Sequence, residues 1–146
     1  MRRAVFDANI LISAFLPRKS PGLALELLSL ARDGEFELVL SSEIIIEAWR
    51  KLMSSENIRS AYTYSDERAY RFCRGLQRIA TTTLRSTQPL AGVVRDPRDD
   101  MVIACAVDGT ADTIVSRDKD LLSLGSYRAI SIITPEQFRE QLRQVE

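Results

Sequence analysis

The chain has 146 residues, of which 45% are hydrophobic and 27% are charged, and its 20 basic side chains balance its 20 acidic ones. This length suits a single compact domain over residues 1–146, and the zero net charge excludes a basic field over the whole molecule. Histidine is absent, which excludes histidine-based catalysis. Cysteine occurs twice, which argues against a disulfide framework, so we expect a protein of the reducing cytoplasm. No apolar run is long enough to cross a membrane.

The first half of the chain predicts alternating strands and helices. Residues 3–7 form an apolar run typical of a strand, and residues 8–16 continue with helical spacing. Ser20 and Pro21 predict the start of the next helix, which Gly34 would close. A second strand is expected at 36–40. The serines at 41 and 42 are suitable N-caps for the helix that follows.

The second half repeats this alternation. A helical region over 54–80 leads into a connection at 81–95 with β-prone pieces, and an apolar helix then ends at Gly109. Strands are expected at 113–116 and 130–133, with a short helical turn closed by Gly125 between them. Thr134-Pro135-Glu136-Gln137 is a capping box for the final helix. The pattern predicts an α/β fold with three layers, α/β/α, around a central and largely parallel sheet.

Acidic residues recur where strands end or helices begin. Asp7 follows the first strand, Asp118 follows a later one, and Asp99 and Asp100 stand in the first turn of the apolar helix. Each has an ordinary explanation as a cap or turn residue. Glu47 could belong to a salt-bridged helix face with Glu43 and Arg50. For Asp96, followed by Pro97, we prefer the capping interpretation.

Taken together, these acids favour a metal site. A parallel sheet brings the carboxyl ends of its strands to one edge, where ligands bind in open α/β folds. Two carboxylates about 4 Å apart repel by roughly 4 kcal/mol at an effective dielectric constant near 20, so several together require a cation. Oxygen ligands without histidine or cysteine suit Mg²⁺ or Mn²⁺, which could activate water for phosphodiester hydrolysis. Helical periodicity does not choose between Asp99 and Asp100 as the ligand.

Four segments together resemble the PIN domain family, in particular the VapC-like PIN ribonucleases of toxin–antitoxin pairs. They are VFDANILISAF, SSEIIIEAWRKL, DPRDDMVIACAVDGTADTIVSRDKDLL and ISIITPEQF. The resemblance implies a PIN-like fold, bound Mg²⁺ or Mn²⁺ and cleavage of single-stranded RNA. Position by position, it implies that metal-binding and catalytic acids stand at Asp7, Glu47, Asp100 and Asp118, with Asp99 beside Asp100 as a further catalytic or supporting acid. It also implies supporting roles for Asn9 and Ser116, which help to orient the acids, and for Asp120 near the rim.

The resemblance further implies a separate antitoxin protein as partner and a homodimer. An RNA path would use local basic clusters, either Arg95, Arg98 and Arg117 or the arginines of residues 68–78, although the latter also suit a solvated helix face. Two alternatives remain open. One is a non-catalytic PIN-like scaffold that binds RNA or protein. The other is an aspartyl phosphotransferase, which Asn9 disfavours because that class has a second aspartate at this position.

Overall fold

A six-stranded sheet forms the centre of the computed structural model, which describes residues 1–18, 20, 22–84 and 97–144, without the side chains of 82–84 and 97–99. The strand order is β3-β2-β1-β4-β6-β5. Every pairing is parallel except that of β5 with β6. The strands are β1 (Arg3–Phe6), β2 (Glu37–Ser41), β3 (Thr82–Leu84), β4 (Thr113–Val115), β5 (Ser126–Tyr127) and β6 (Ile130–Ile133).

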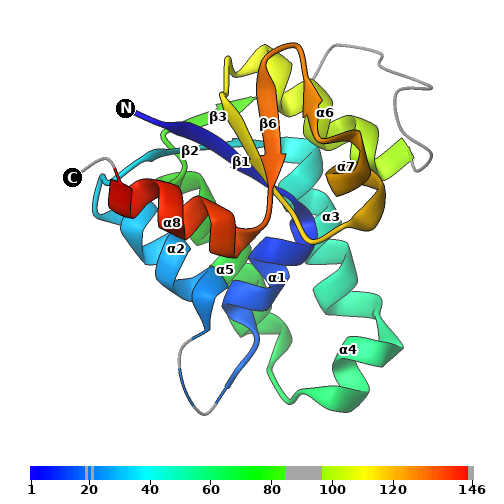
Figure 1. The fold of residues 1–146 in the computed structure, drawn as a ribbon. Helices are drawn as coiled ribbons and strands as arrows, with labels where there is room; N and C mark the ends of the chain where they lie inside the picture. Colours follow the sequence, from blue (N-terminus) through cyan, green and yellow to red (C-terminus); the bar gives the residue numbers. More distant parts are fainter. Residues whose placement is uncertain (19, 21, 85–96, 145–146) are drawn as a thin grey trace.

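Helices cover both faces of this sheet, as the predicted α/β fold requires. The helix α6 packs on β1, β2 and β4 with α3 beside it, whereas α2 and α8 contact each other on the other side (Figure 1). No helix in the described residues is long and apolar enough to span a bilayer. The helices are α1 (Ala8–Phe15), α2 (Leu23–Arg32), α3 (Ser42–Ser54), α4 (Glu56–Ala61), α5 (Asp66–Ile79), α6 (Pro97–Asp108), α7 (Lys119–Leu124) and α8 (Pro135–Gln144).

Several helix ends confirm the predicted capping chemistry. Before α8, the Gln137 N–H donates to Thr134 Oγ1 at 3.2 Å and the Thr134 N–H donates to Gln137 Oε1 at 2.9 Å, a reciprocal capping box. The Ser41 hydroxyl accepts from the Ile44 N–H at the start of α3. After α2, Gly34 takes a φ of +84°, a left-handed conformation that glycine adopts at little steric cost.

Three boundaries differ from the sequence expectations. The prediction that Ser20 caps α2 is wrong, because that helix begins at Leu23 with Gly22 as its N-cap. The region 54–80 is two helices, α4 and α5, separated by an extended stretch from Tyr62. The hairpin strand β5 was not expected. Its turn places Arg128 and Ala129 at positive φ, and neither residue is of the glycine or asparagine type that would reveal such a turn in the sequence.

The core between β1, α2 and α8 is built on three buried phenylalanines. The Phe138 ring from α8 lies edge-on to Phe36, with ring centroids 4.9 Å apart, and edge-on to Phe6 at 6.2 Å. All three side chains are at most 1% exposed. Burial of such a side chain contributes about 1.5–3 kcal/mol, so this cluster holds the last helix on the first strand.

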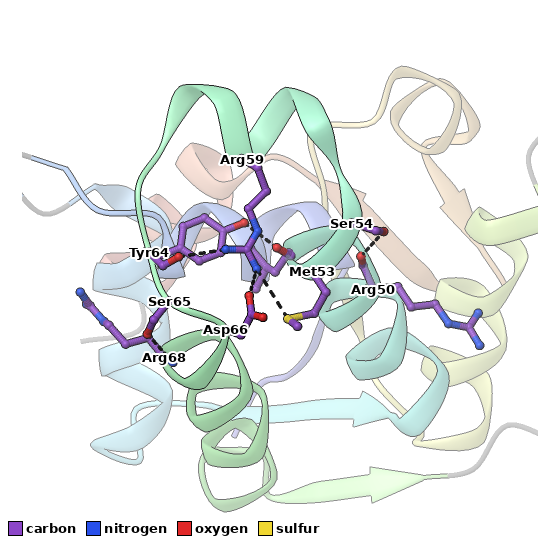
Figure 2. Close-up of polar contacts among 9 residues, drawn as sticks. Arg50, Met53, Ser54, Arg59, Tyr64, Ser65, Asp66 and Arg68 are labelled. Carbon is purple, nitrogen blue, oxygen red and sulfur yellow. Dashed lines mark hydrogen bonds and ion pairs between the residues drawn. The ribbon is translucent and has the colours of Figure 1, made fainter.

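A polar cluster around Arg59 fixes the path from α3 through α4 to α5 (Figure 2). The Arg59 guanidinium donates to the Tyr64 carbonyl at 2.9 Å, pairs with Asp66 and lies 4.4 Å from the Tyr64 ring centroid. The Tyr64 hydroxyl donates in turn to the Leu52 carbonyl at 2.7 Å. Since α4 has no fully buried residue and contributes only the partly buried Ile58 to the core, these polar contacts add to a small hydrophobic contact.

Replacement of Arg59 by Met is therefore expected to lower the free energy of unfolding by about 1–2 kcal/mol, because it removes charged hydrogen bonds and a cation–π contact. Urea denaturation measures this. The control is Arg71→Met in the same region, since Arg71 pairs with Glu67 at 2.9 Å but both side chains are about two-thirds or more exposed, and such pairs contribute little. Equal effects of the two substitutions would contradict the structural role of Arg59.

Candidate active site

Asp7 stands at the carboxyl end of the central strand, where it ends β1 and caps α1. Its Oδ1 accepts the Ile10 N–H at 3.0 Å, and its backbone N–H donates to the Val115 carbonyl of β4 at 3.4 Å. The residue is 5% exposed. The capping interpretation of Asp7 is thus correct, but the cap occupies one oxygen of the carboxylate and the other faces β4.

Ser116 joins Asp7 to Asp118. It follows β4 directly and is fully buried. Its hydroxyl donates to Asp7 Oδ2 and accepts the Asp118 N–H at 2.9 Å. Residues 109 positions apart are thereby linked. This arises because β1 and β4 are neighbours in the sheet, with Phe6 paired to Val115.

Asp118 caps α7 with one carboxylate oxygen. Its Oδ1 accepts the N–H groups of Asp120 at 2.8 Å and of Leu121 at 3.2 Å, whereas Oδ2 takes part in neither bond. The pattern is the same as at Asp7, in which a helix cap fixes the carboxylate. Asp120 lies in the first turn of α7, two residues after Asp118.

Burial raises the pKa of Asp7 above its ordinary value of 3.8, and the negative charge of Asp118 acts in the same direction. The hydrogen bonds from Ser116 and Ile10 and the positive charge of Lys51 lower the pKa but do not offset burial. The ionised form of Asp7 is therefore less favourable in this environment than in water. A cation bound at its carboxylate would relieve that cost.

Glu47 approaches this edge from α3, where it is paired with a lysine. Lys51 Nζ lies 3.8 Å from Glu47 Oε1, one helical turn away, and donates to Asn9 Oδ1 on α1 at 3.1 Å. The sequence suggested a salt-bridged face of Glu47 with Glu43 and Arg50, whereas the ion pair seen is with Lys51. The contact of Lys51 was not predicted, although a spacing of four from Glu47 favours such a pair. Asn9 contacts this lysine and has no hydrogen bond to Asp7 among those described.

The first turn of α6 lies toward the same edge. Arg3, at the start of β1, donates to the Gly109 carbonyl at 2.8 and 3.2 Å, which places the last turn of α6 at the amino edge of the sheet. Twelve helical residues extend about 18 Å, so Asp100 stands toward the carboxyl edge, where it is partly buried. Asp96 and the Asp99 side chain lie outside the described residues. The choice between Asp99 and Asp100 therefore remains open.

One arginine of the predicted basic cluster near the site is engaged in an ion pair. Arg117 forms two hydrogen bonds with the carboxylate of Glu136 on α8, at 2.9 and 2.7 Å. This pair raises the pKa of Arg117 and lowers that of Glu136. Arg117 therefore anchors the loop after β4 to α8. Arg95 and the Arg98 side chain lie outside the described residues.

The donor set fits a divalent ion that keeps most of its water. Among the side chains that the structure describes, no group of three or more acids, cysteines or histidines is arranged to hold a metal ion. Asp7 and Asp118 nevertheless offer two electrostatically coupled carboxylates. Mg²⁺ commonly binds through one or two carboxylates, several waters and substrate phosphates. The residues suit this kind of site and not a closed cage of protein ligands.

Because the pKa of Asp7 is raised in the folded protein, the ionised side chain lowers the stability of the folded state relative to the unfolded chain. Its folded-state pKa lies above 3.8, so stability falls as pH rises from about 3.8 through the folded pKa, and the loss persists at neutral pH. In metal-free buffer at pH 7, Asp7→Asn is expected to raise Tm by about 2–4 °C, the shift that about 1 kcal/mol produces at this size.

Thermal unfolding between about pH 3 and pH 8 measures this effect: the difference from wild type should grow as pH rises from about 3.8 through the folded-state pKa and then stay constant. Asp33→Asn is the control, because the Asp33 side chain is 61% exposed, and it should change Tm little. A lower Tm for Asp7→Asn at pH 7 would mean that the hydrogen bonds of the carboxylate outweigh its burial.

Known proteins similar to this chain share its fold. A search of curated proteins returned no match. Among solved structures, the chain is similar to one in the crystal structure of VapBC2 from Rickettsia felis bound to a DNA fragment from their promoter, with a TM-score of 0.60 and 13% identity over 89% of this chain and 96% of that one. At this identity the similarity concerns the fold. The PIN domain model matches residues 3–120, which contain Asp7, Glu47 and Asp118. The chain therefore belongs to the PIN domain family.

Proposed function

We propose that this protein is a metal-dependent endoribonuclease that hydrolyses phosphodiester bonds of single-stranded RNA, and that residues 1–146 act as one domain. The observation that carries the proposal is the Asp7–Ser116–Asp118 hydrogen-bonded chain at the carboxyl edge of β1 and β4. Burial of a carboxylate next to a second carboxylate lowers stability. Groups that carry such a cost are found most often at functional sites. Membership of the PIN domain family supports the same function.

Asp7 and Asp118 would hold Mg²⁺ or Mn²⁺, with Glu47 and Asp100 as further ligands and Asp99 as a neighbouring acid. The ion supplies positive charge beside the phosphate and a water of lowered pKa. The protein itself would position the carboxylates that bind the ion. Ser116 holds the carboxylate of Asp7 and the backbone at Asp118, while the caps of α1 and α7 each hold one carboxylate oxygen of these residues.

The roles of the remaining predicted residues follow from their contacts. Asn9 would act through Lys51, since its amide oxygen accepts from that ammonium. Asp120 would lie at the rim, where an approaching nucleotide passes. Hydrolysis would occur by direct attack of water. No protein nucleophile is required.

A toxin role with an antitoxin partner is part of the proposal. The similar structure from Rickettsia felis is of VapBC2 bound to promoter DNA, and its fold similarity supports a toxin–antitoxin pair in which this chain is the toxin. A homodimer acting in the cytoplasm would suit that role. Co-purification of this chain with the product of an adjacent small reading frame would support the pairing.

A non-catalytic PIN-like scaffold is the second candidate. It is favoured by one observation: within the described part of the chain, no three potential ligands are grouped for a metal. A scaffold would keep the hydrogen bonds of Asp7 and bind RNA or protein without a divalent ion. Calorimetric titration with Mn²⁺ near neutral pH separates the two, since a scaffold would show no binding.

Cleavage of labelled single-stranded RNA tests the nuclease. Wild type is expected to cleave the RNA in Mg²⁺ or Mn²⁺ and to be inactive in EDTA. Asp7→Asn and Asp118→Asn should each reduce the rate by at least about 100-fold, since mutation of a residue that only supports a metal ligand already reduces activity by about 10–100-fold. Asp33→Asn is again the exposed control. Because Asp7→Asn is expected to be as stable as wild type or more so, unfolding would not explain its loss. EDTA-resistant cleavage, or full activity in both variants, would rule out this mechanism.

A further inference from the structure

A lysine lies among the proposed acidic ligands and contacts two helices there. Lys51 on α3 donates to Asn9 Oδ1 of α1 at 3.1 Å, and its ammonium is 3.8 Å from Glu47 Oε1. The side chains of Lys51 and Glu47 are 28% and 17% exposed. The Lys51 side chain is thus partly buried where α1 and α3 meet, and its hydrogen bond to Asn9 lies at the solvent-exposed end.

The contact with Asn9 fixes the amide's orientation. A lysine ammonium has donors and no acceptor, so Asn9 must turn its oxygen toward it. The positive charge of Lys51 also acts on the Asp7 carboxylate. Lys51 is therefore linked by a hydrogen bond, an ion pair and a longer-range charge interaction to three of the proposed site residues.

An ordinary helix salt bridge does not have these links. A Glu–Lys pair four residues apart on an exposed helix contributes about 0.3–0.5 kcal/mol and touches nothing else. The adjacent Arg50 provides the comparison. It is exposed, and no side-chain contact of it appears among the described residues.

We propose that Lys51 is an internal counter-cation of the acidic site, which holds Glu47 and Asn9 in place in the absence of a divalent ion and competes with that ion for the same carboxylates. The proposal rests on the proposed function, because it requires that Glu47 and Asp7 belong to a metal site. Two cations close to one carboxylate repel each other, so the lysine weakens binding of the metal. Lys51 is accordingly a positioning residue that sets the metal concentration at which the site fills.

Calorimetric titration of the full chain with Mn²⁺, together with thermal unfolding in EDTA, tests this. Lys51→Met removes the charge and keeps much of the side-chain volume. It is expected to bind Mn²⁺ about tenfold more tightly, which corresponds to about 1.4 kcal/mol, and to have a lower Tm without metal. Lys51→Gln should behave in the same way and serves if the first variant does not fold.

Two controls separate a specific charge effect from a general one. Lys51→Arg keeps the positive charge, so its Mn²⁺ affinity should stay close to that of wild type. Arg50→Met removes a neighbouring charge from the same helix and should change the affinity less than twofold. The combination of tighter metal binding with lower metal-free stability is a result that a purely structural lysine would not give.

The outcomes distinguish this proposal from the nuclease. If wild type binds Mn²⁺ and both neutral Lys51 variants bind it equally or more weakly, the counter-cation role is overturned while the metal-dependent nuclease stands. If no variant binds Mn²⁺, both proposals fail.

Discussion

The cost of placing a carboxylate inside the fold determines how this site is built. Asp7 is almost fully buried, and burial raises its pKa. Its two oxygens are nonetheless satisfied, one by the first turn of α1 and the other by Ser116. The surrounding structure therefore holds the charge in position without removing its cost. Binding of a cation would offset the free-energy cost of this buried charge. The metal-free protein would thus be less stable than it could be, a trade of stability for function that is common at functional sites.

The sheet topology explains why the acids meet. β1 lies at the centre, with β2 on one side and β4 on the other, so the chain leaves β1 in one direction and returns to its other edge after α6. Open α/β sheets bind ligands at such a reversal of strand order. Asp7 and Ser116 are the first residues after two neighbouring strands. The aromatic cluster around Phe138 includes Phe6, the last residue of β1, and so packs next to this edge. The contacts of Arg59 stabilise the path from α3 through α4 to α5.

Much of this could be predicted from the sequence, because it depends on local patterns. Apolar periodicity predicted the alternating elements, and the capping box predicted the start of α8. Acids placed after strands predicted a meeting of carboxylates at one edge of the sheet, where Ser116 links Asp7 to Asp118. The N-cap of α2 was misplaced because Ser20-Pro21 resembles a helix start more closely than Gly22 does. The β5 hairpin was missed because its turn residues, Arg128 and Ala129, carry no turn signal. Lys51 and the ion pair of Arg117 depend on contacts between distant elements, which periodicity does not encode.

The proposed metal-dependent nuclease requires that the buried Asp7 and its neighbour Asp118 share a divalent ion. Anomalous diffraction from a crystal soaked in Mn²⁺ locates the metal without relying on activity. We expect an anomalous peak in contact with the carboxylates of both Asp7 and Asp118 at the carboxyl edge of β1 and β4. A peak confined to other acids, or no peak at these two carboxylates at saturating Mn²⁺, would contradict it.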